Sequence, residues 1–165
     1  YDDYFSRLES GELLDPEKMK VHDSLKFKTP GGKTVYGGGG IIPDVFVPFD
    51  NSMNNETLTY IQNRGYVANF AFEMLDKDRR AYENMPKQDF VDNFEVTDEM
   101  VFRFQEYLNA RTGSKITFVA YNEEVKLYIK ATLADQLYGN GSFNEIINQK
   151  DIMIEEVIKL SERSN

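Results

Sequence analysis

Residues 31–50, GGKTVYGGGGIIPDVFVPFD, contain the stretch whose residue types most suggest chemistry. Glycine costs about 0.5–1 kcal/mol relative to alanine inside an ordinary strand, so the four successive glycines Gly37–Gly40 need a physical reason. A phosphate cradle, a sharp bend and a very close backbone contact are the three candidates. Each would use the conformational freedom of glycine in a different way.

A phosphate cradle does not fit the spacing around these glycines. A P-loop needs Gly-x-x-x-x-Gly-Lys-Ser/Thr between a strand and a helix, and Gly32, Lys33 and Thr34 match only its end. The first glycine of the motif would fall on Phe27, and strand-like residues follow where a helix is required. A Gly-x-Gly-x-x-Gly pattern fails as well, because its last position is Ile42 or Pro43. The sequence therefore predicts no nucleotide cofactor.

Hydrolytic chemistry lacks a residue set. His22 is the single histidine and lies in a polar connection, the chain has no cysteine, and no Gly-x-Ser-x-Gly elbow is present. Nothing in the sequence places Ser24 beside a base. We interpret His22 as a solvated loop residue, and the sequence predicts no catalytic residue in this chain.

A metal site is not predicted either. Asp50, Ser52 and Asn54 have the alternate spacing of a calcium loop, but the required glycine falls on Asn55 and the bidentate glutamate on Ile61. The other carboxylates are more typical of a solvated face.

Composition limits the partners that the chain could bind. Its 165 residues carry a net charge of −9, and no basic stripe lies between the aromatic residues, which disfavours nucleic acids and anionic membranes. No apolar run approaches the roughly 20 residues of a membrane span. The chain begins at Tyr1, not at Met, so we expect a piece of a longer polypeptide whose signal segment would precede it.

The first third of the chain has the pattern of a short helix and a few strands. We expect a helix within residues 1–14 that ends near Gly11. The alternation over residues 25–36 and the PGGK turn predict a β-hairpin with Leu25 and Phe27 on its half-buried side. Residues 44–49 are expected to form a further short strand, which Pro48 ends or confines to an edge.

Beyond residue 51 the apolar spacing is helical. One long or broken helix, interrupted near Gly65, would bury Leu58, Ile61, Val67, Phe70, Ala71, Met74 and Leu75, with Asn55 or Thr57 as its cap. Residues 85–94 are expected to be a loop, and residues 115–121 a strand or an entry segment. Thr97 should begin a helix that ends at Gly113, and residues 122–138 should form another helix that ends at Gly139. Residues 142–164 should form one or two more helices, in which Ile154, Val157 and Ile158 are buried.

These patterns predict an α+β fold that is mainly α. Residues 1–50 would hold a short helix, a hairpin, a glycine-rich turn and a strand, and residues 51–165 a bundle-like helical domain. So few strands leave unpaired edges, which natural proteins normally cover. We therefore expect them to pair with a larger sheet that is absent from this chain.

The glycine-rich segment resembles a motif of the C-terminal processing (tail-specific) serine peptidases, in particular their long Bacteroidetes-type forms. The family pattern is Phe-x-Thr-x-x-Gly-Arg-x-Val-Tyr-Gly-Gly-Gly-Gly-Ile-x-Pro-Asp. The matching residues are Phe27, Thr29, Gly32, Val35, Tyr36, Gly37, Gly38, Gly39, Gly40, Ile41, Pro43 and Asp44, with Lys33 where arginine is usual. A weaker similarity to the tail of these long forms covers residues 130–160.

The resemblance implies a serine nucleophile and a lysine base upstream of Tyr1, on a core that usually also carries a PDZ domain. Lys26, Lys28 and Lys33 lie in the wrong segment to be that base. The chain would then be a non-catalytic, C-terminal part of an exported periplasmic or cell-envelope peptidase. It would be inactive by itself, and would act in core stabilisation, substrate access or oligomerisation. Its partners would be the upstream core, the protein substrates of the parent and a second copy.

Under this resemblance Gly37–Gly40 form a structural device where the hairpin passes into a strand of the core sheet. Pro43 would fix the backbone and Asp44 would bind nearby amides. A role in lining the substrate cleft of the intact enzyme is the alternative for the glycines. For the whole chain, the alternative is a free-standing α-rich module that binds a protein partner.

Overall fold

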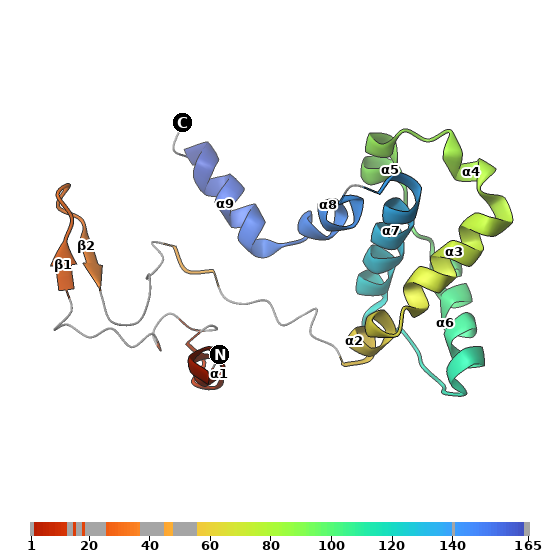
Figure 1. The fold of residues 1–165 in the computed structure, drawn as a ribbon, viewed down its shortest axis with the longest axis horizontal. Helices are drawn as coiled ribbons and strands as arrows, with labels where there is room; N and C mark the ends of the chain where they lie inside the picture. Colours follow the sequence, from red (N-terminus) through yellow and green to blue (C-terminus); the bar gives the residue numbers. More distant parts are fainter. Residues whose placement is uncertain are drawn as a thin grey trace. The chain divides into compact units, whose positions relative to one another are not determined.

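The computed structural model describes residues 2–12, 15, 18, 26–36, 45–47, 56–139 and 141–163. These residues form nine helices and one antiparallel pair of short strands (Figure 1). The predicted fold class, α+β and mainly α, is confirmed.

The chain divides into two compact units, Tyr1–Asp50 and Asn51–Asn165. This division falls where the sequence changes from strand-like alternation to helical spacing. Each unit is described by itself below.

The described part of the first unit holds one helix and one hairpin. Helix α1 (Asp2–Glu9) is followed by Gly11, whose φ of 80° lies in the left-handed region that glycine adopts without cost. Strands β1 (Lys26–Lys28) and β2 (Thr34–Tyr36) pair antiparallel, with Phe27 opposite Val35. The turn is closed by the Thr29 amide, which donates to the Lys33 carbonyl at 2.8 Å. The predicted helix and hairpin are therefore confirmed.

Two predictions for this unit are wrong. Val45–Val47 form no strand, and the rest of the predicted strand lies outside the described residues. The Phe27 side chain is 57% exposed, not half-buried, because the hairpin has no described layer packed on that face. Both errors have the same cause, because strand pairing and side-chain burial in a strand depend on neighbouring elements and not on the local sequence alone.

The second unit is a helical bundle centred on α7 (Asn122–Tyr138). Its elements are α2 (Glu56–Asn63), α3 (Tyr66–Asp78), α4 (Arg80–Glu83), α5 (Lys87–Asn93), α6 (Asp98–Thr112), α7, α8 (Ser142–Asn148) and α9 (Ile152–Arg163). Helix α7 packs against α3, α5, α6 and α8, as Figure 1 shows. Because it has neighbours on several sides, α7 buries apolar side chains around much of its circumference, among them Val125, Ile129, Ala131 and Leu133.

The predicted break at Gly65 separates α2 from α3. Gly65 has a φ of 70°, and its amide closes the end of α2 on the Gln62 carbonyl at 2.9 Å. The seven apolar residues expected to be buried here are all buried: Leu58, Ile61, Val67, Phe70, Ala71, Met74 and Leu75. Thr57 lies inside α2 and does not cap it, while Asn55 lies outside the described residues.

Residues 85–94 contain a helix, so their prediction as a loop is wrong. Helix α5 follows Pro86 and buries Phe90 and Val91, and the Phe90 ring stacks on Phe94 with centroids 4.3 Å apart. The flanking Pro86 and the first-turn carboxylate of Asp89 were usable helix-start signals. Helix α4, a single turn, was also missed.

Helices α6 and α7 have the predicted ends. The Thr97 hydroxyl accepts a hydrogen bond from the Met100 amide at 3.3 Å, and the left-handed Gly113 follows α6. Gly139 follows α7. Residues 115–121 form no strand, and they place Phe118 in the core as an entry segment.

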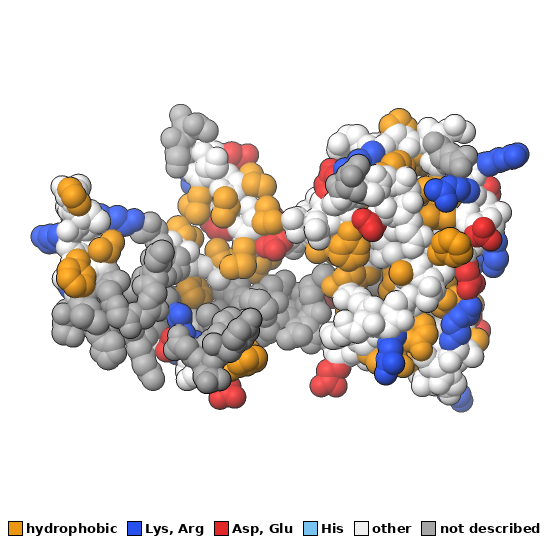
Figure 2. All heavy atoms as spheres, in the orientation of Figure 1, with side chains coloured by type: hydrophobic (Ala, Val, Ile, Leu, Met, Phe, Trp, Pro, Cys, Tyr) orange, Lys and Arg blue, Asp and Glu red, His pale blue; other side chains and the backbone are white. Residues whose placement is uncertain are grey.

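The last segment forms a pair of helices, as one of the two alternatives predicted, but the burial expected for α9 is wrong. Helix α9 buries no residue, and Ile154, Val157 and Ile158 are 37%, 63% and 53% exposed. Hydrophobic side chains are visible along this helix in Figure 2. The Asp151 carboxylate caps α9 by accepting from the Met153 and Ile154 amides at 2.8 and 3.2 Å.

Candidate functional site: the groove between α3 and α6

The residues singled out by the sequence lie mostly outside the described part of the chain. Gly37, Gly38, Gly39, Gly40, Pro43 and Asp44 belong to this group, as do His22 and Ser24. Lys26, Lys28 and Lys33 lie on the exposed hairpin. The structure therefore gives no geometry for the predicted glycine motif.

The described ranges contain no group of three or more His, Cys, Asp or Glu side chains that could hold a metal ion. Across the same residues, no helix combines the length and apolar character needed to cross a membrane.

A groove lies between α3 and α6 in the described part of the helical unit. It has a volume of about 240 Å³. The lining residues come from these two helices alone: Phe70, Glu73, Met74 and Lys77 from α3, and Phe102, Arg103, Glu106 and Tyr107 from α6. Lys77, Glu73 and Phe70 follow one another at intervals of three or four, which places them along one side of α3.

The groove has an apolar floor and a charged rim. Phe70 and Met74 are buried, whereas Phe102 is 59% exposed and adds apolar surface at the side. Lys77, Arg103 and Glu106 have exposed side chains at the rim. A concave apolar surface with a few charged groups around it is the usual composition of a binding site.

One wall of the groove is fixed by a contact between the two helices. The Arg111 Nη2 atom on α6 donates to the Glu73 Oε1 atom on α3 at 2.7 Å. The Arg111 guanidinium carbon also lies 3.5 Å from the centroid of the Tyr107 ring. Both partners of Arg111 line the groove, so Arg111 fixes their side chains from outside it.

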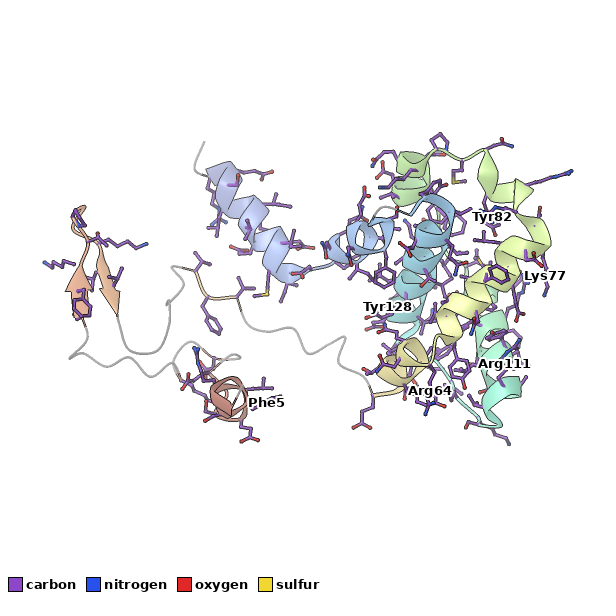
Figure 3. The ribbon with its side chains drawn as sticks, in the orientation of Figure 1. Phe5, Arg64, Lys77, Tyr82, Arg111 and Tyr128 are labelled. Carbon is purple, nitrogen blue, oxygen red and sulfur yellow. The ribbon has the colours of Figure 1, made fainter. Side chains whose placement is uncertain are left out.

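A second arginine–tyrosine pair lies at the start of α3. The Arg64 guanidinium carbon is 5.7 Å from the centroid of the Tyr60 ring, and the Tyr60 and Tyr66 rings are 6.0 Å apart. Figure 3 shows Arg64 at the α2–α3 junction, and Lys77 and Arg111 on α3 and α6. Tyrosine and arginine are the residue types most enriched at the energetic centres of protein interfaces.

Two tyrosines of this region have raised pKa values. Burial raises the pKa of Tyr107, Arg111 opposes this shift, and Glu73 adds to it. The hydrogen bond with Tyr60 is the main cause of the raised pKa of Tyr66. Both phenols are neutral at pH 7. They present hydroxyl groups for hydrogen bonding, not negative charge.

Lys130 is a partly buried amine outside the groove. Its Nζ atom donates to the Val91 carbonyl at 2.7 Å, and burial lowers its pKa, with Asp92 and Glu95 opposing the shift. This bond joins α7 to the end of α5. We assign Lys130 a structural role, because one of its three N–H donors holds a backbone carbonyl of a neighbouring helix.

Sequence reasoning predicted the burial of Phe70 and Met74 in the groove floor, but it did not predict the groove or its charged rim. The Tyr107–Arg111 pair was detectable in principle, since residues four apart on a helix are neighbours. The Glu73–Arg111 pair was not, because 38 positions separate the two residues and only the packing of α3 on α6 brings them together.

Comparison with known proteins identifies a family for this chain. No curated protein and no solved structure matches the chain. A family of unknown function (DUF8443) matches residues 57–139, just over half of the chain, from α2 to the end of α7. The match contains both walls of the groove and excludes the hairpin, α8 and α9. The chain therefore belongs to the DUF8443 family.

Proposed function

We propose that this chain is a non-catalytic, C-terminal region of a C-terminal processing serine peptidase that cleaves proteins in the periplasm or cell envelope. The proposal starts from the resemblance of residues 27–44 to the glycine-rich motif of that family. In this proposal the first unit joins the catalytic core, and the helical unit acts in core stabilisation, substrate access or oligomerisation.

The open hairpin is the structural observation that supports this proposal. Phe27 and Val35 lie directly opposite each other in the β1–β2 pair and are 57% and 40% exposed. An isolated two-stranded hairpin is only marginally stable in water, and further strands or a packed helix normally cover its apolar face. A core sheet would provide such a cover.

A free-standing α-rich interaction module is the second candidate. The α3–α6 groove and its neighbouring arginine–tyrosine pairs favour this reading, because both are formed entirely within the helical unit and need no peptidase core. The two candidates differ in what lies next to the hairpin in the intact protein.

The first test is to read the native coding sequence upstream of Tyr1 and to express the whole encoded protein. We expect an export signal, a serine nucleophile and a lysine base, and cleavage of a protein substrate that is lost when that serine is changed to alanine. A start codon or an unrelated domain directly upstream of Tyr1 would overturn the peptidase proposal and leave the interaction module.

The second test uses residues 1–165 with the same substrate. We expect no turnover. Turnover that Ser24→Ala abolishes would show that the chain carries its own nucleophile, and would contradict the assignment of a non-catalytic region.

A further inference from the structure

Helix α9 presents an apolar face that nothing in the described helical core covers. We define the α9 apolar face as Met153, Ile154, Val157 and Ile158, which are 47%, 37%, 63% and 53% exposed. Their spacing of three and four places them on one side of the helix. A soluble protein normally covers an apolar stripe of this kind with another surface.

Acidic side chains border the α9 apolar face. At 100° per residue, Glu156 lies beyond the edge formed by Met153, and Glu162 lies beyond the edge formed by Ile158. Lys159 lies on the opposite side, within 3.7 Å of Glu155 and 3.9 Å of Glu156. A surface that covers this face would therefore meet apolar groups first and carboxylates at the margins.

The α3–α6 groove has complementary chemistry. Its apolar side chains are Phe70, Met74, Phe102 and Tyr107, and its rim carries the cations Lys77 and Arg103. The Glu73 carboxylate is already paired with Arg111 at 2.7 Å. Among the groove-lining residues, two cations then remain and one unpaired carboxylate, that of Glu106. The groove is therefore locally positive, although the net charge of the chain is −9.

The lengths of the two surfaces agree. The α9 apolar face covers residues 153–158, about 9 Å at 1.5 Å per residue. The groove is lined over residues 70–77 of α3, about 12 Å, and residues 102–107 of α6, about 9 Å. A helix of this size can lie along the groove with its apolar face inward, which is a common mode of helix recognition.

We propose that the α9 apolar face of one copy binds in the α3–α6 groove of a second copy. Residues 149–151 connect α9 to α8, and α8 packs on α7, so α9 starts beside elements that contribute nothing to the groove. Exchange between two copies brings the surfaces together without moving α8. A reciprocal exchange forms two equal contacts and closes a two-fold dimer.

This inference deepens, and rests on, the oligomerisation role in the proposed function. The self-association measurement does not depend on catalytic activity. A chain that does not associate would therefore not affect the peptidase assignment, which the upstream sequence tests separately. A failed peptidase assay likewise does not change the measured mass.

The test is the mass of residues 1–165 in solution, measured by sedimentation equilibrium from about 1 to 200 µM. We expect a dimer of twice the 19.1 kDa chain mass. Val157→Glu with Ile158→Glu should weaken association at least tenfold. Since α9 buries no residue, the circular dichroism and thermal unfolding of this variant, measured where both proteins are monomeric, should match the wild-type chain.

A charge exchange tests the groove. Lys77→Glu with Arg103→Glu should weaken association at least tenfold, and adding Glu156→Lys with Glu162→Lys to the same chain should restore it. Lys115→Glu, an exposed change outside the groove, is the matched control and should have no effect.

Three results would overturn the proposal. The first is a wild-type chain that stays monomeric at 200 µM. A cross-link between α9 and the groove within such a monomer would show that α9 binds its own copy. The second is a dimer that withstands Val157→Glu with Ile158→Glu. The third is a dimer that withstands Lys77→Glu with Arg103→Glu.

Discussion

The Arg111 guanidinium carbon lies 3.5 Å from the centre of the Tyr107 ring, one helical turn away on α6, while its Nη2 atom donates to Glu73 on α3 at 2.7 Å. One side chain therefore links a groove-lining tyrosine to a carboxylate of the opposite wall. A guanidinium can do both because its face stacks on a ring while its edge donates hydrogen bonds.

This relationship predicts how Tyr107 titrates. Burial raises the Tyr107 pKa, the Arg111 charge lowers it, and the Glu73 charge raises it. Arg111→Met should therefore raise this pKa further, and Glu73→Gln should lower it. NMR titration of ¹³Cζ-labelled tyrosine would measure both shifts, with Arg80→Met on α4 as a control that leaves the Tyr107 signal unchanged.

The raised Tyr107 pKa also sets a direction for stability. The unfolded phenol ionises near its ordinary pKa of about 10, before the folded one does. The contribution of Tyr107 is fully present below that pH and is lost as pH rises through the folded pKa. Tyr107→Phe should therefore make the free energy of unfolding less sensitive to pH above 10, and an unchanged slope would contradict the raised pKa.

The Asp98–Lys126 pair predicts an acid-dependent link between α6 and α7. Hydrogen bonding to Lys126, at 2.8 Å, is the main cause of the lowered Asp98 pKa, with Asn122 adding to it. The lowered pKa gives stability that is present above the ordinary aspartate pKa of about 3.9 and is lost as pH falls through the folded value. Asp98 in turn raises the Lys126 pKa, so that contribution is present below about pH 10.4 and is lost above it.

A double-mutant cycle measures this link. Urea unfolding of the wild type, Asp98→Asn, Lys126→Met and the double variant should show a small favourable coupling at pH 7 that shrinks below pH 3.9. A coupling that is equal at pH 7 and pH 3 would contradict an ionic link. Lys115→Met is the control for loss of a lysine charge elsewhere on the surface.

Phe90 should contribute more to stability than its place in a predicted loop implies. Its side chain is fully buried, stacks on Phe94 and meets the Tyr138 ring edge-on at 5.6 Å. Phe90→Ala should lower the free energy of unfolding by about 3–5 kcal/mol, because it removes packing and leaves a cavity. Phe72→Ala, at a residue 61% exposed on α3, should change it by no more than about 0.5 kcal/mol in the same urea titration.

Gly65 should tolerate asparagine better than alanine. Its φ of 70° lies in the left-handed region, and a Cβ there would have only the Asn69 side chain near it, at 4.0 Å. The cost is therefore conformational, about 1–2 kcal/mol for Gly65→Ala and less for Gly65→Asn, since asparagine enters this region more readily. Equal thermal stability of the two variants would show that the backbone strain is absent.

The sequence alone determined the helices whose ends and faces are encoded locally. Thr97 and Gly113 fix the ends of α6, Gly65 separates α2 from α3, and the spacing from Leu58 to Leu75 identified seven residues that are all buried. These signals act over one or two helical turns, because capping bonds and backbone preferences depend on neighbours in the sequence.

Tertiary structure decided which surface packs against the apolar face of each element. Local spacing gives the hairpin an apolar side at Phe27, and it gives α9 a separate one at Ile154, Val157 and Ile158. Burial also requires a surface to pack against, and within the described residues these side chains are exposed. The groove likewise depends on Glu73 meeting Arg111 across 38 positions. Local periodicity specifies an amphipathic element, whereas its partner is selected only when the bundle packs, since side-chain contacts between distant segments have no local signature.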